Sequence, residues 1–279
     1  ISTITSVLGL NHYITAYGID YQALLVFCLM WGMGGSIVSL MISKWIAKRM
    51  MGVQLVDQNS QYGHLINMVS NLSRQSGITK MPEVGIYNSP DVNAFATGPS
   101  KNNSLVAVSS GLLSKLNQDE LEGVLGHEIA HIANGDMVTM TLVQGVVNAF
   151  VMFFSRIAAF AVSSAMNSDD DDGPRSGGFL QFGLVILFDI IFGLLAMPVV
   201  AWFSRYREYR ADAGGSALAG KEKMIAALEK LKSTYEITAQ LPGAETGMQS
   251  MQISSKSKFF KWFSTHPPLD ARIDALRNR

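Results

Sequence analysis

The 279-residue chain has little charge and almost no cysteine. Charged residues make up 16% of it, against about 25% in a typical soluble protein. The 22 basic and 22 acidic residues cancel, so no excess of positive charge is available to neutralise nucleic-acid phosphates. The single cysteine, Cys28, excludes a disulfide within the chain and a metal site built on paired cysteines. Hydrophobic residues reach 48%, and the composition therefore indicates a membrane protein rather than a nucleic-acid-binding one.

Three long apolar runs account for much of this hydrophobic content. They cover residues 22–42, 138–166 and 179–203, and only Arg156 and Asp189 interrupt them. Each run reaches the roughly 20 residues that a helix needs to span a bilayer. The alternative, helices buried in a large soluble core, is disfavoured because the first run lacks a polar face. A lone charge inside a membrane is costly, so we expect Arg156 and Asp189 to pair between helices rather than to line a polar path.

The charges that flank the runs predict their orientation. Basic residues follow the first and third runs, whereas aspartates dominate the loop between the second and third. Since basic residues mark the cytoplasmic side, residues 43–137 and 204–279 should form the two parts of one cytoplasmic domain. Residues 138–203 are then a transmembrane hairpin with its acidic loop, 167–178, outside. Residues 1–42 form an N-terminal membrane region, which begins either with the tail of an earlier spanning helix or with an interfacial segment.

The first cytoplasmic part is predicted to contain a helix followed by short strands. Residues 59–75 have the periodicity of an amphipathic helix, and residues 82–87, 93–97 and 104–109 are typical of strands. An exposed edge strand can bind an extended substrate by backbone pairing. Our candidate for that edge is the third strand: Ser104, Leu105, Val106, Ala107, Val108 and Ser109.

The next helix carries a His-Glu-x-x-His motif. It has a predicted capping box at residues 117–120 and a predicted end at residues 134–135. His127 and His131 are four residues apart, so both imidazoles project from one face of the helix and can bind one metal ion. Zn²⁺ suits imidazole and carboxylate ligands. Glu128 projects beside that metal and could take a proton from a water that the metal activates.

A catalytic zinc site needs a third protein ligand and one open position. No third histidine follows at short spacing, so we assign Glu208, although an ordinary ion pair with its arginine neighbours is the alternative. Asp212, one turn later, would orient a ligand histidine through its other ring nitrogen. His266 precedes two prolines, and the pattern alone favours a turn at a helix start over a donor to an oxyanion.

Several ordered motifs resemble those of the HtpX-type membrane zinc proteases, bacterial relatives of the CAAX prenyl proteases. The motifs are NAFATG, SLVAVSSGLL, GHEIAHIANGDMVTMTL, SRYREYRADAGG and THPPLDARI. The resemblance extends from about residue 32 to the C-terminus. It implies a zinc endopeptidase of the bacterial inner membrane, with one Zn²⁺ per chain and a role in heat-shock and envelope quality control. It also implies four spanning helices, so residues 1–10 would be the end of a truncated first one.

The resemblance also assigns roles to individual residues. It implies His127, His131 and Glu208 as zinc ligands and Glu128 as general base and acid. It implies that Asp212 supports a ligand and that His266 is a hydrogen-bond donor to the transition state. By similarity to the prenyl-protease relatives, Asn93 and Arg272 would also face the substrate.

We therefore expect a mainly α integral membrane protein with a cytoplasmic α+β zincin-like protease domain that carries a small β-sheet. Its expected substrates are misfolded or damaged membrane proteins, and other membrane quality-control proteases are candidate partners. Two alternatives stay open. One is a CAAX-type prenyl-protein endoprotease, and the other is a non-catalytic membrane scaffold with a structural zinc.

Overall fold

A computed structural model describes residues 14–15, 18–166, 177–240 and 266–279. The predicted helix tail at residues 1–10 and most of the acidic loop lie outside these residues. The chain forms two compact units. One unit contains residues up to 38 and residues 141–200, and the other contains residues 39–140 and 201–279.

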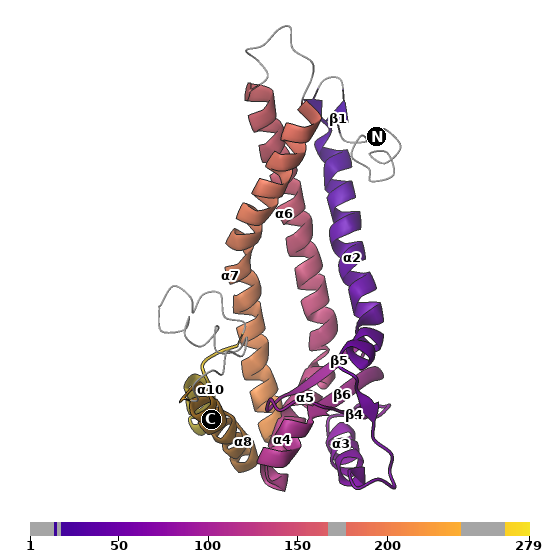
Figure 1. The fold of residues 1–279 in the computed structure, drawn as a ribbon, viewed down its shortest axis with the longest axis vertical. Helices are drawn as coiled ribbons and strands as arrows, with labels where there is room; N and C mark the ends of the chain where they lie inside the picture. Colours follow the sequence, from indigo (N-terminus) through magenta and orange to yellow (C-terminus); the bar gives the residue numbers. More distant parts are fainter. Residues whose placement is uncertain (1–13, 16–17, 167–176, 241–265) are drawn as a thin grey trace. The chain divides into compact units, whose positions relative to one another are not determined.

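Three long helices have the length and apolar composition of membrane spans: α2 (Tyr21–Met50), α6 (Asp136–Met166) and α7 (Gly177–Ala219) (Figure 1). Each contains one of the apolar runs and extends beyond it. Large apolar side chains on them are exposed, including Trp31, Phe150 and Leu195, each more than half exposed. Helices of a soluble core would bury these side chains, so the membrane-span prediction is favoured. A short hairpin, β1 (Ile14–Thr15) and β2 (Gly18–Ile19), precedes α2.

The charged residues of the apolar runs do not pair as predicted. Arg156 donates to the carbonyl of Met152 at 3.0 Å and lies over the ring of Phe27, 5.5 Å from its centroid. Among the described residues, Arg156 Nε and Asp189 Oδ1 are buried without a hydrogen-bond partner. The expected Arg156–Asp189 ion pair is therefore wrong, because the arginine side chain turns back to its own helix and to an aromatic face.

The second unit is built on a four-stranded mixed sheet. Its strands are β3 (Gln54–Leu55), β4 (Glu83–Tyr87), β5 (Ala94–Ser100) and β6 (Asn103–Ser109). Their order is β3-β4-β6-β5, with β4 and β6 parallel and the outer pairs antiparallel. All three strands predicted in this region are present, with ends that differ by a few residues.

The predicted edge strand is in fact an interior strand. Residues Ser104 to Ser109 belong to β6, which pairs with β4 on one side and β5 on the other. All six of these side chains are buried. Since both backbone edges of β6 are occupied, it has none to offer an extended substrate. Among the described strands, β5 and the two-residue β3 form the edges of this sheet.

Helices cover the sheet and build the core of this unit. They are α3 (Gly63–Gln75), α4 (Ser110–Lys115), α5 (Gln118–Asn134), α8 (Lys221–Gln240) and α10 (Leu269–Arg277). Buried leucine, isoleucine and valine side chains from α3, α4 and α5 pack together with those of β4 and β6. Helix α3 begins four residues later than predicted, because Asp57 accepts the backbone N–H of Asn59 in a turn. Figure 1 shows α5 beside this sheet, with α8 on the same unit.

Candidate metal centre

Local signals fix both ends of α5, which carries the His-Glu-x-x-His motif. The side chain of Asn117 accepts the N–H of Glu120, and the Glu120 carboxylate accepts the N–H of Asn117, each at 2.9 Å. This is the capping box that the sequence predicts. At the other end Gly135 adopts a left-handed conformation with φ 73°, and Lys101 donates to the exposed carbonyl of Ala133. The motif helix is thus held at both termini.

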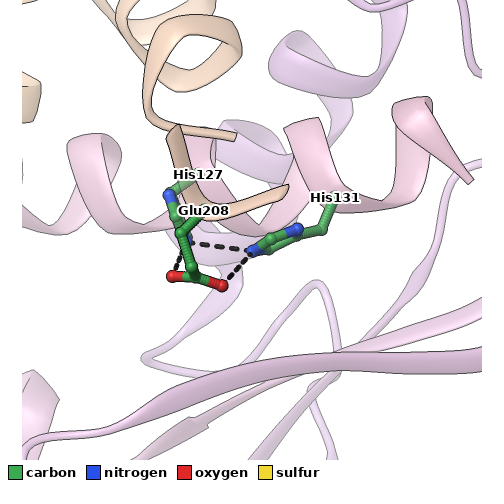
Figure 2. Close-up of side chains that lie close together, drawn as sticks. All are labelled: His127, His131 and Glu208. Atoms are coloured by element: carbon green, nitrogen blue, oxygen red, sulfur yellow. Dashed lines mark hydrogen bonds and ion pairs between the residues drawn. The ribbon is translucent and has the colours of Figure 1, made fainter. Parts of the chain in front are cut away.

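Three side chains converge on one point from two helices. His127 and His131 project from α5 and Glu208 projects from α7 (Figure 2). The two Nε2 atoms are 3.1 Å apart. The Glu208 carboxylate oxygens lie 3.6 Å from Nε2 of His127 and 3.4 Å from Nε2 of His131. Ligand atoms placed 2.0–2.1 Å from a tetrahedral Zn²⁺ are about 3.3–3.4 Å apart, so these separations fit such an ion.

A carboxylate holds the other nitrogen of each histidine. Asp212 Oδ1 is 2.9 Å from Nδ1 of His127, and Asp136 Oδ2 is 2.6 Å from Nδ1 of His131. A proton on Nδ1 that is donated to a carboxylate leaves the lone pair of Nε2 directed at the cluster. Both rings are therefore oriented for metal binding.

Asp136 is the site residue that the sequence reasoning missed. It lies five residues after His131, at the first position of α6, and is 2% exposed. A spacing of five does not bring two side chains together on a straight helix. The left-handed Gly135 breaks the helix between them and turns Asp136 back toward the histidine. The signal was present in the sequence, as an acid directly after the Asn-Gly helix end.

Glu208 and Asp212 are each 2% exposed, and one arginine contacts both. Arg272 of α10 donates from Nε to Asp212 Oδ2 at 2.8 Å and from Nη2 to Asp212 Oδ1 at 2.6 Å. Its Nη1 lies 3.5 Å from Glu208 Oε2. Burial opposes the charged form of Arg272, but the hydrogen bonds to Asp212 outweigh it and raise its pKa. Arg272 is 7% exposed, so its guanidinium is buried where it contacts the two carboxylates.

The electrostatics of the cluster suit a cation. Burial lowers the pKa of His131, but the bonds to Asp136 and Glu208 outweigh it and raise the pKa to about 9. Burial likewise lowers the pKa of His127, and the carboxylates of Asp212 and Glu208 again raise it above the ordinary value. The donor set therefore favours positive charge at this point. Two imidazoles and one carboxylate are also the ligand types that Zn²⁺ prefers, so the residues fit a zinc ion.

The other predicted site residues, Glu128, His266 and Asn93, differ in their contacts with the cluster. Burial raises the pKa of the Glu128 carboxyl, and the backbone N–H of Ala96 in β5 opposes part of that rise. His266 lies with Nδ1 3.1 Å from Glu208 Oε2, and its side chain is 66% exposed. Asn93 precedes β5, where its backbone bonds to Ser109. Among the described residues, no hydrogen bond joins the Asn93 side chain to the candidate metal cluster.

Comparisons with known proteins agree with this geometry. Residues 59–279 match the profile of peptidase family M48. The chain is 52% identical over 256 residues to "Protease HtpX" of Tolumonas auensis, covering 91% of this chain and 86% of the relative. It is 49% identical over 278 residues to "Protease HtpX" of Shewanella pealeana, covering 99% and 93%. It is 50% identical to "Protease HtpX" of Escherichia fergusonii, covering 92% and 87%.

The fold also resembles that of a solved structure. The crystal structure of S. mikatae Ste24p superposes with a TM-score of 0.67 at 20% sequence identity. The match covers 90% of this chain and 58% of that one. At this identity the likeness concerns the fold, in which long apolar helices are combined with a small mixed sheet.

Proposed function

Because this chain belongs to peptidase family M48 and is a metalloprotease with helices that can span a membrane, we propose that it cleaves misfolded or damaged membrane proteins. The proposed place is the cytoplasmic face of the bacterial inner membrane, and the proposed role is quality control under envelope stress. One observation carries the proposal. His127, His131 and Glu208 converge in segments that lead directly into candidate membrane spans.

In the proposed mechanism Glu128 moves the proton. It would take a proton from the attacking water and then give it to the leaving amine of the cut peptide bond. Its carboxyl is buried, which raises the pKa. Zn²⁺ held by the three ligands would supply a Lewis acid that polarises the peptide carbonyl and activates water. Asp136 and Asp212 would keep the ligand rings in place.

We assign His266 and Arg272 different parts in this mechanism. The exposed side chain of His266 lies at the carboxylate of Glu208, where it could donate a hydrogen bond to the developing oxyanion. Arg272 has Nε and Nη2 on Asp212 and Nη1 near Glu208. A guanidinium engaged in this way is better suited to holding the two carboxylates than to contacting a substrate.

Strand β5 is the proposed place for the substrate backbone. Among the described strands it pairs only with β6, and it packs beside α5. The backbone of Ala96 in β5 also lowers the pKa of Glu128, which supports placing the proposed general base beside this strand. An extended peptide added to the edge of β5 would use its backbone for affinity and little of its side-chain identity. Such binding suits an enzyme that cleaves damaged proteins of many different sequences.

Chain connectivity supports a site close to the bilayer. His131 lies five residues before Asp136, where α6 begins. Glu208 lies on α7, about 8 Å beyond Phe203 at the end of the apolar run, at 1.5 Å per helical residue. Basic residues cluster at these same ends, which supports a cytoplasmic placement. They are Lys44, Lys48 and Arg49 after the first run and Arg205, Arg207 and Arg210 after the third.

The experiment compares Glu128→Gln with the wild-type protein in lipid nanodiscs. The substrates are a membrane protein with an unfolded cytoplasmic loop and, separately, a prenylated peptide. We expect Glu128→Gln to slow cleavage of the first by about 10²–10⁴-fold, the usual contribution of a general base, with zinc content unchanged. Glu122→Gln is the matched control, because Glu122 lies on the same helix and bonds to Lys223 instead. Undiminished cleavage by Glu128→Gln contradicts the mechanism, and cleavage of the prenylated peptide alone supports the narrower alternative.

A further inference from the structure

The two helices that carry the candidate metal ligands touch at their backbones. A Cβ added at Gly214 of α7 would lie 2.7 Å from the Cβ of Ala130 on α5. A Cβ added at the neighbouring Gly215 would lie 2.9 Å from the backbone nitrogen of His127. Ordinary contacts between carbon atoms are about 3.5–4.0 Å. Neither position can therefore carry a side chain unless α5 and α7 move apart.

This contact lies next to the ligands. Ala130 directly precedes His131 on α5, and Gly214 follows Glu208 by six residues on α7. The separation of the two helices at this point therefore determines how far the Glu208 carboxylate lies from the two imidazoles. Relieving a 2.7 Å contact between two Cβ atoms would require a displacement of about 1 Å. Metal-ligand distances tolerate only about 0.2 Å, so the displacement would exceed what the site can absorb.

We propose that Gly214 is a positioning residue for the metal centre, and that its contact with Ala130 sets the spacing between the ligand-bearing helices. The inference rests on the assignment of His127, His131 and Glu208 as ligands under the proposed function. The missing side chain at position 214 lets Glu208 reach the histidines. Gly214 itself touches neither metal nor substrate.

The contact between Gly214 and Ala130 can also be relieved by a change on α5. Such a change distinguishes a role in helix spacing from a requirement for glycine at position 214 for any other reason. An alanine at position 214 would meet a single side-chain atom, the Cβ of Ala130. Removing that atom with Ala130→Gly would restore the space. At Gly215 the obstructing atoms are backbone, so no side-chain change would compensate there. The pair Gly214 and Ala130 therefore gives a double-mutant test.

The experiment measures Zn²⁺ affinity by chelator competition on the full chain in detergent, with the visible absorption of the Co²⁺-substituted protein as a second readout. We expect Gly214→Ala to weaken Zn²⁺ binding by about 10–100-fold, the usual effect of disturbing the groups that orient a ligand, and to change the Co²⁺ spectrum. The double variant Gly214→Ala/Ala130→Gly should recover wild-type affinity and spectrum. Gly193→Ala is the matched control on α7, because no atom lies within 4 Å of the added Cβ.

Each outcome decides the proposal. Wild-type affinity in Gly214→Ala overturns it, and so does a loss that persists in the double variant. If Gly214→Ala does not fold, the double variant must fold and bind Zn²⁺ normally, and its failure also overturns the proposal. Glu208→Gln is measured alongside. Unchanged Zn²⁺ binding in Glu208→Gln would show that the assignment of Glu208 as a ligand has failed. The result for Gly214→Ala would then be interpreted separately from that failure.

Discussion

The two compact units of this chain differ in how the carboxylates within them are compensated. In the unit with the candidate metal cluster, Glu208 lies within 3.6 Å of His127 and His131, of His266 and of Arg272. In the unit of apolar helices, Asp189 Oδ1 is buried with no hydrogen-bond partner among the described residues. The first carboxylate is surrounded by groups that can carry positive charge, whereas no described residue forms a hydrogen bond with Oδ1 of the second.

The contrast shows what each buried charge contributes. Removing one partner of a buried pair leaves the other uncompensated and is strongly destabilising. Removing a buried charge that has no partner relieves a desolvation penalty instead. Substitutions in the two units should therefore have opposite signs. Replacing a residue of the cluster should lower stability or metal affinity, whereas replacing Asp189 should not.

The largest effect is expected at Arg272. Changing Arg272 to Met removes the two hydrogen bonds to Asp212 and leaves that carboxylate buried without its main cation. We expect a loss of about 3–5 kcal/mol in the free energy of unfolding, measured by denaturant titration in detergent micelles. The matched control is Arg277→Met on the same helix. Arg277 pairs with Glu229 at the surface, so about 0–1 kcal/mol should be lost. Equal losses in the two variants would contradict the comparison.

A smaller effect is expected at Asp136, which bonds to His131 from the start of α6. Asp136→Asn keeps the shape of the side chain but removes the charge that orients the imidazole. We expect Zn²⁺ affinity to fall by about 10–100-fold, with the fold retained. Chelator competition measures the affinity, and far-ultraviolet circular dichroism checks the fold. Asp119→Asn on the surface of α5 is the control, since its carboxylate bonds to Lys223. An affinity equal to that of the control would show that Asp136 does not orient the ligand.

The sequence predicts the part of this cluster that depends on short spacing. His127 and His131 share a helix face because they are four residues apart, and the capping box at Asn117 is also a local signal. Glu208 could be assigned because zinc chemistry requires a third ligand, and a glutamate on a later helix is a common solution. The bidentate contact of Arg272 with Asp212 could not be predicted in this way, since sixty residues separate the two. Such contacts depend on how α10 docks against α8, which no local pattern specifies.

The sheet gives a similar lesson. The apolar run of β6 predicted a strand correctly, but its neighbours in the sheet come from elsewhere in the chain. Strand order is therefore a non-local property. A signal was nonetheless present. A strand that is apolar at successive positions is buried on both faces, which is typical of an interior strand and not of an edge. Glycine positions such as Gly214 were missed for the same reason, because only the packed structure shows what a side chain there would meet.

The smallest effect, with the opposite sign, is expected at Asp189. Asp189→Leu removes a carboxylate whose Oδ1 is buried without a partner, and we expect unfolding in detergent micelles to cost about 1 kcal/mol more, at the low end of the penalty for an unsatisfied group. The control is Asp20→Leu in the same unit, where the carboxylate accepts the N–H groups of Gln22 and Ala23 at the start of α2. Losing that cap should destabilise by about 1 kcal/mol. If Asp189→Leu destabilises as much as the control, the charge has a partner and the comparison fails. If stability holds while proteolysis falls, Asp189 belongs instead to a polar path that the enzyme uses.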